Sequence, residues 1–285
     1  MADHLPDESA PVVPERRSGS PVALHRLEID PQSTLMAEAG RASIGLWRFD
    51  VERSGLVLGS TQPWSDVDHG VASSLGIEVG RRRSGGGAVL LWPRGQVWLD
   101  IVVPRGHPRW DDRVDVATHW IGEAWRLALA EFGIQAVVHR GGNQPGPLGS
   151  AVCFAGIGPG EVGEVRAVAE VGTSGEFPMP NGVGPARKLV GIAQRRQRAV
   201  ARFQTSVAVG LECPWSAHEL GALLRPASHR CGVAPTDLAR AIAPVPLTID
   251  ADRLAEKLEA VIRAQSGMGE PGEPGEPGGP GGPAR

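Results

Sequence analysis

The clearest periodic pattern along the chain lies between Asp112 and Phe132. Apolar residues recur there at three- and four-residue spacings, and Gly133 closes the segment. This spacing predicts a helix with one buried face, so its tryptophans are expected in the core. Weaker patterns of the same kind predict further helices over residues 31–42, 64–75, 217–224, 235–242 and 250–264.

Short apolar or alternating runs between these helices predict strands. Two of them, Ala88–Trp92 and Gln96–Val103, surround Pro93-Arg94-Gly95, which is a hairpin signal. The other strands are expected at residues 46–49, 56–59, 77–79, 136–139, 151–154, 189–193 and 199–211. The chain therefore mixes helices and strands throughout its middle part.

Both ends of the chain have a different composition. Residues 1–20 are rich in Pro, Ser, Asp and Glu and are expected to form a disordered arm. Residues 266–285 repeat Gly-Glu-Pro and Gly-Gly-Pro, too briefly for a collagen helix, and are expected to form a flexible tail.

One catalytic domain is expected over residues 21–265. Within it, the patternless stretch 163–184 lies directly before Lys188 and is predicted to be a mobile flap.

Composition narrows the classes of function. A net charge of -3 and a pI near 6.3 argue against a nucleic-acid-binding protein. The three cysteines, Cys153, Cys213 and Cys231, are too scattered for a disulfide framework or a four-ligand zinc site. No apolar run reaches the ~20 residues that a membrane span needs. We therefore expect a cytoplasmic protein with no membrane or nucleic-acid partner.

The candidate chemistry begins in the run RRRSGGGAV, residues 81–89. Glycines let the backbone approach a ligand and expose its N–H groups, while arginines supply charge for a carboxylate or phosphate. By itself this pattern is also typical of a plain turn between strands. A second segment, Arg187–Arg196, carries a lone lysine, Lys188, which in isolation is typical of a solvated surface charge.

Together the two segments resemble the lipoate-protein ligase family. Its members carry an arginine pair before a Gly-Gly-Gly-Ala-Val loop and a lysine in a Lys-x-x-Gly-x-Ala-Gln segment, here Lys188 to Gln194. The resemblance runs from about Leu35 to Ile262. It implies an α+β fold with a mixed, largely antiparallel sheet flanked by helices, like the catalytic domain shared by biotin and lipoate ligases.

The resemblance also implies a reaction. Family members use ATP, with Mg2+, to convert lipoate or octanoate into an acyl-adenylate and then attach the acyl group to a lysine of a carrier domain. The carriers would be the apo lipoyl domains of 2-oxoacid dehydrogenases or the glycine cleavage H protein. Lys188 would face the acyl carbonyl and the α-phosphate, where charge develops. The resemblance places Gly85, Gly86, Gly87 and Ala88 along the adenylate and acyl chain, and Arg82 at the carboxylate or phosphate.

The chain departs from the family pattern at three places. Leu90-Leu91-Trp92 replaces the aromatic residue and His-Asp pair that usually follow the glycine loop. An Asn-Asp pair ahead of the lysine is matched only by Gly160-Glu161, and Gln204 stands where a histidine is expected. A binding module with a degenerate ligase fold is therefore an alternative to an enzyme.

Cys153 supports a further alternative. Octanoyltransferases related to the ligases take an octanoyl group from acyl carrier protein and hold it on a cysteine as a thioester, without ATP. One branch places that cysteine in a Cys-Phe segment before the lysine, and Cys153-Phe154 is similar in position. The simpler interpretation of Cys153 is a small buried apolar residue.

Overall fold

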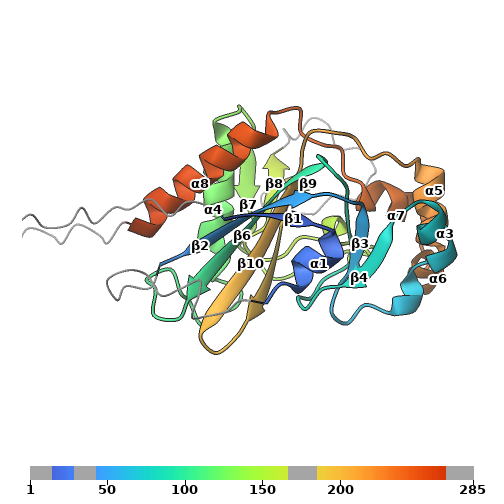
Figure 1. Ribbon diagram of the computed structural model, residues 1–285, viewed down its shortest axis with the longest axis horizontal. Helices are drawn as coiled ribbons and strands as arrows, with labels where there is room; N and C mark the ends of the chain where they lie inside the picture. Colours follow the sequence, from blue (N-terminus) through green and yellow to red (C-terminus); the bar gives the residue numbers. More distant parts are fainter. Residues whose placement is uncertain (1–14, 29–42, 166–184, 268–285) are drawn as a thin grey trace, which may run out of the picture.

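A computed structural model describes residues 15–28, 43–165 and 185–267, and it contains two β-sheets in this part of the chain (Figure 1). In the larger, seven-stranded sheet all neighbouring strands run antiparallel except the first two, which are parallel. Its order is β1 (Glu15–Gly19), β2 (Gly45–Val51), β6 (Gln96–Pro104), β10 (Val200–Ala208), β9 (Pro185–Arg196), β8 (Val162–Val165) and β7 (Ala136–Val138). The predicted mixed, largely antiparallel α+β architecture is confirmed.

A smaller sheet has the order β4 (Glu78–Arg81), β3 (Gly55–Leu58) and β5 (Val89–Leu91). The hairpin expected around Pro93–Gly95 is wrong, because β5 pairs with β3 whereas β6 pairs with β2 and β10. The turn instead carries the chain from one sheet to the other. Local turn residues indicate a reversal, but they do not specify which strand each arm pairs with.

Two long helices, α4 (His119–Ala130) and α8 (Ala251–Gly267), cover one face of the large sheet (Figure 1). Trp125 of α4 is fully buried in this core, as the apolar pattern predicts. Helix α4 begins seven residues later than the predicted Asp112. The carboxylate of Asp111 accepts from the backbone N–H of Arg113, and such a local turn competes with helix formation.

Four helices pack with the small sheet around a second core: α3 (His69–Ser74), α5 (Ala217–Leu223), α6 (Arg225–Cys231) and α7 (Pro235–Ile242). The helix predicted over residues 64–75 is divided into the 3-10 turn η2 (Trp64–Asp66) and α3, whose N-terminus Asp68 caps. The strand predicted at residues 151–154 is also wrong. Its second half is another 3-10 turn, η3 (Cys153–Ala155), which presents Cys153 at the site described below.

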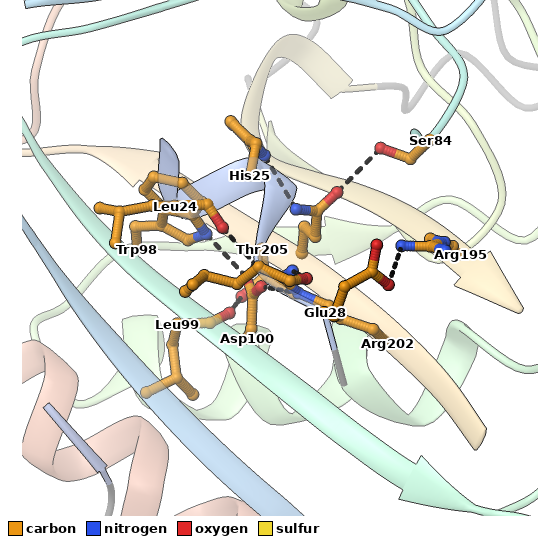
Figure 2. A network of polar contacts seen from close by, with 12 residues as sticks. Leu24, His25, Glu28, Ser84, Trp98, Leu99, Asp100, Arg195, Arg202 and Thr205 are labelled. Carbon is orange, nitrogen blue, oxygen red and sulfur yellow. Dashed lines mark hydrogen bonds and ion pairs between the residues drawn. The ribbon is translucent and has the colours of Figure 1, made fainter. Parts of the chain in front are cut away.

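A third apolar layer, which includes Trp98 and Leu91, lies between the two sheets under the short helix α1 (Pro21–Arg26). The disordered arm expected over residues 1–20 is wrong for residues 15–19, because they form β1 and pair with β2. Arg202 holds α1 in place by donating to the carbonyls of Leu24 and Leu27, and Asp100 accepts from the same guanidinium at 2.5 Å (Figure 2). A buried ion pair thus fixes the position of α1.

Several sequence predictions fall outside the described residues. These are residues 1–14 of the predicted arm, the helix at 31–42, residues 166–184 of the flap predicted over 163–184, and residues 268–285 of the tail predicted over 266–285. The first residues of the flap instead belong to β8, and the first two of the tail belong to α8. Within the described residues, no helix is both long and apolar enough to span a membrane.

Candidate functional site

The glycine loop, the 3-10 turn η3 and strand β9 border one cavity of about 460 Å3, here called the main cavity. This volume lies in the range of small-molecule sites. The expected residues Gly85, Gly86, Gly87, Cys153 and Lys188 all line it. Further lining is contributed by Asp115, Thr118, Asn143, Gly158, Glu161, Ile192, Ala193 and Gln194. Segments more than a hundred residues apart in the chain therefore converge on one space.

Packing explains Gly87 and backbone conformation explains Gly86, two of the three loop glycines. A Cβ on Gly87 would lie 2.5 Å from the backbone nitrogen of Val152, which leaves no room for a side chain. Gly86 has a φ of +94°, a conformation that other residues rarely adopt. Gly85 differs, because a Cβ there would meet no atom within 4 Å. Its backbone is therefore open to the main cavity.

Ala88 connects the loop to the small sheet and is itself fully buried. Its N–H donates to the carbonyl of Ala151 at 2.8 Å, and its carbonyl accepts from the N–H of Cys153 at 2.9 Å. These two bonds hold the glycine loop against the turn η3. Ala88 thus positions the site rather than lining the main cavity.

Arg82 is 2 % exposed and points into the protein. Its guanidinium donates to the carbonyls of Val57, Gly85 and Gly87 at 3.1, 2.7 and 2.8 Å. Two of these contacts hold the glycine loop in shape and the third binds β3, and Arg82 is not among the residues that line the main cavity. Its contact with a carboxylate or phosphate stays a prediction. A buried backbone turn needs donors for its carbonyls, and the adjacent arginine supplies them.

Lys188 lies on β9 with its amine buried at the main cavity. The Nζ atom is 2.7 Å from Oε1 of Glu161 and donates to the carbonyl of Cys153 at 2.9 Å. Glu161 is held in turn by the N–H groups of Gly158 and Ile192, at 2.7 and 3.0 Å. The lysine therefore has one fixed direction, with its charge placed where the glycine loop ends.

The pKa of Lys188 is raised above its ordinary value. Burial alone would lower it, but the electrostatic effects of Cys153 and Glu161 and their hydrogen bonds to the amine outweigh that effect. The amine consequently keeps its proton. A protonated, oriented lysine serves as a stabiliser of developing negative charge, and not as a base or nucleophile.

Cys153 brings a sulfur atom to the same point. Its Sγ lies 3.6 Å from Nζ of Lys188, and the thiol is free and partly exposed at the main cavity. A sulfur atom at the wall of a cavity can reach a molecule bound there. The Cys153 thiol can therefore contact a ligand in the main cavity, whereas a cysteine with only a packing role in the core would be fully buried.

The model of the lipoyl protein ligase A/B catalytic domain matches residues 31–259. The chain belongs to this family. No curated protein sequence matches it. Among solved structures, it is similar to lipoate-protein ligase A bound with ATP, with 18 % identity, 90 % of this chain and 85 % of that chain covered, and a TM-score of 0.53.

A second similar structure is a Thermoplasma acidophilum protein described as a lipoate protein ligase, with bound lipoic acid. The identity is 17 %, the coverage is 81 % of this chain and 76 % of that chain, and the TM-score is 0.50. At these identities the likeness establishes that the chain has the lipoyl ligase fold.

In this lipoyl ligase domain, sequence reasoning missed Glu161 as a partner of the lysine. The signal was present, because Gly160-Glu161 occupies the place of the family's Asn-Asp pair. The sequence could not supply the register of β8 against β9. This register is irregular between Val162 and Val165, and it brings the Glu161 carboxylate beside the amine of the lysine.

A second, smaller space of about 30 Å3, here called the inner cavity, adjoins the main cavity of the ligase domain. Cys153, Ile192 and Ala193 line both. The walls of the inner cavity are mostly apolar, with Val89, Leu91, Trp98 and Phe154, and its polar side is formed by His25, Arg82, Gln204, Thr205 and Ser206. It lies between the two sheets, beside the third apolar layer.

Mg2+ stays a prediction for this ligase domain. The described residues contain no group of three or more His, Cys, Asp or Glu side chains arranged to hold a metal ion. Glu161 already accepts from Lys188, Gly158 and Ile192. We therefore assign no step to Mg2+.

Proposed function

We propose that this protein attaches lipoate or octanoate to a lysine of a lipoyl carrier domain after activating the acid with ATP. The observation that carries the proposal is the buried Lys188 amine, fixed by Glu161 at a cavity bordered by the glycine loop. The similar solved structures were determined with ATP and with lipoic acid, which supports these two as substrates.

The residues of the main cavity fit the two steps of such a reaction. The acid's carboxylate attacks the α-phosphorus of ATP, pyrophosphate leaves, and an acyl-adenylate results. The carrier lysine then attacks the acyl carbonyl, an amide bond forms, AMP leaves, and the amine loses its proton. Negative charge grows on oxygen in both steps, and the fixed ammonium of Lys188 stabilises it. The open backbone of Gly85 lies beside the same space.

A second candidate function rests on one contact, the 3.6 Å between Sγ of Cys153 and Nζ of Lys188. In this octanoyltransferase reaction the Cys153 thiolate attacks an acyl thioester on acyl carrier protein. A new thioester forms on Cys153 and the carrier's thiolate leaves. The lysine amine of the lipoyl domain then attacks that thioester, which forms the amide, regenerates the thiolate and releases the amine proton.

One assay decides between these candidates. The protein is mixed with an apo lipoyl domain and given either lipoate plus ATP or octanoyl acyl carrier protein. Wild type is compared with Cys153→Ser and with Lys188→Gln, which keeps a donor for Glu161. Product that requires ATP and survives Cys153→Ser supports the ligase, and product from the acyl carrier protein that is lost in Cys153→Ser supports the transferase.

The same assay can overturn both proposals. Lys188→Gln is expected to abolish product from either donor, and its melting temperature checks that the variant is folded. If a folded wild-type protein forms no product from either donor, both reactions are rejected and the alternative of a binding module with a ligase fold is favoured.

A further inference from the structure

Two side chains at the inner cavity each carry a nitrogen donor that has no hydrogen-bond partner among the described residues. These are His25 and Arg82, whose Nε2 and Nε atoms are buried. Buried donors are costly to leave unpaired, so such atoms beside an open space indicate a group that accepts hydrogen bonds there.

A directed chain of hydrogen bonds fixes which nitrogen of His25 carries the proton. The Ser84 hydroxyl donates to the side-chain carbonyl of Gln204 at 2.8 Å, which sets the direction of the amide. The amide nitrogen of Gln204 then donates to Nδ1 of His25, also at 2.8 Å (Figure 2). Because Nδ1 accepts, the proton of the neutral ring is on Nε2. The imidazole therefore offers an N–H donor at its unpartnered nitrogen.

The ring of His25 stays neutral. Burial lowers its pKa well below 6.5, and the positive charges of Arg82 and Arg202 lower it further, against a smaller opposing effect of the Gln204 hydrogen bond. The inner cavity thus combines apolar walls with one neutral donor from His25 and one donor from the Arg82 guanidinium. An uncharged acceptor atom on an otherwise apolar chain matches this lining.

The donor is also held in place. His25 lies at 4.4 Å between ring centroids from Trp98, and Trp98 donates to Asp100, which holds Arg202. Arg202 in turn binds the carbonyl of Leu24, the residue before His25 (Figure 2). A donor fixed in this way can discriminate between ligands, because the protein cannot rotate it toward another acceptor.

We propose that His25 is a specificity-determining residue, whose Nε2–H donates to an oxygen or sulfur atom at the far end of the acyl chain. This inference rests on the proposed acyl substrate. The chain enters from the main cavity past Cys153, which lines both spaces, and its end lies in the inner cavity. An acid whose far end carries an acceptor atom is preferred over one that ends in a plain methyl group.

The competing explanation is a buried water molecule. A space of about 30 Å3 is large enough for one. The two explanations differ in what they predict for substrates. A permanently bound water would make no distinction between chain ends, whereas the proposed contact favours an acceptor.

Binding of the free acids tests the proposal without catalysis. Calorimetric titration compares octanoate, omega-hydroxyoctanoate and lipoate on wild type, His25→Leu and His25→Gln. Wild type is expected to bind the hydroxy acid and lipoate roughly three- to ten-fold more tightly than octanoate, the range of one hydrogen bond. His25→Leu should bring this ratio close to one, and His25→Gln, which keeps an N–H donor, should retain part of it.

The proposal is overturned if wild type does not prefer the acceptor-bearing acids. It is likewise overturned if a folded His25→Leu variant keeps an unchanged ratio, which would assign the N–H to water. Wild type that binds none of the three acids also overturns it. Transfer to the apo lipoyl domain is measured in parallel. Selective binding without any transfer rejects the proposed function and leaves the inference about His25 standing.

Discussion

Lys188 and Glu161 form a buried ion pair in which Nζ and Oε1 are 2.7 Å apart, with side chains 2 % and 7 % exposed. Two backbone N–H groups hold the carboxylate from the other side. The pair therefore does more than neutralise a charge, since it fixes the direction of the ammonium at the main cavity. Burying two charges in this way is expensive, which makes a purely structural role a poor explanation.

Replacing the carboxylate tests this relationship through pH. In Glu161→Gln, Lys188 loses a partner that raises its pKa, so that pKa should fall. Because the proposed reaction requires the protonated amine, the loss of acyl transfer at high pH should begin at a lower pH than in wild type. The pH dependence of kcat/KM measures this shift. An unchanged alkaline limb would mean that Glu161 does not tune the lysine.

A pair of alanine substitutions separates packing from ligand contact in the glycine loop. Gly87→Ala places a methyl group against the backbone nitrogen of Val152 and should destabilise the fold by about 1–3 kcal/mol. Gly85→Ala adds a methyl group to open space and should change stability by less than about 0.5 kcal/mol. Its KM should rise, because that methyl group borders the main cavity. Urea denaturation and steady-state kinetics distinguish the two, and a Gly85→Ala variant with wild-type KM would contradict the assignment.

Arg82 is expected to act through the loop that it holds. In Arg82→Lys, one ammonium cannot reach all three carbonyls that the guanidinium serves, so buried acceptors lose their partners and stability should fall by about 2 kcal/mol. Arg83→Lys is the matched control, because the Arg83 side chain is half exposed and pairs with Glu28 at the surface. Thermal or urea unfolding of both variants checks this. Equal stabilities would show that the carbonyl contacts of Arg82 contribute nothing.

The buried histidine should make the fold sensitive to acid. The folded-state pKa of His25 lies below 6.5, so under acidic conditions the unfolded chain binds a proton that the folded chain does not. Stability contributed by the neutral ring is present above pH 6.5 and decreases as pH falls toward the folded pKa. Between pH 7.5 and 5.5 this costs about 1 kcal/mol of unfolding free energy. His107 and His119 have lowered pKa values as well, so the effect assigned to His25 is the difference in pH slope between wild type and His25→Gln.

The sequence by itself determined the parts of this protein that depend on local pattern. Apolar spacing located five strands of the large sheet, β2, β6, β7, β9 and β10, and the helices α4, α5, α7 and α8, because burial imposes a period on the chain. It did not predict β1 or β8. The glycine loop and the lysine segment identified the family and named Lys188 and Cys153, which do meet at one cavity. The family and its candidate site residues can be predicted from residue types and their order alone.

Only the tertiary structure decided how the residues are paired. The irregular register between β8 and β9 brings Glu161 to Lys188, and a turn that leaves one sheet for the other separates β5 from β6. Arg82, adjacent in sequence to the glycines, donates to two carbonyls of the loop, contacts that the sequence did not predict. His25 lies 179 residues from Gln204 in sequence, yet the two share a hydrogen bond. No local signal predicts such contacts, because they arise from strand order and from the need to satisfy buried polar groups across the whole core.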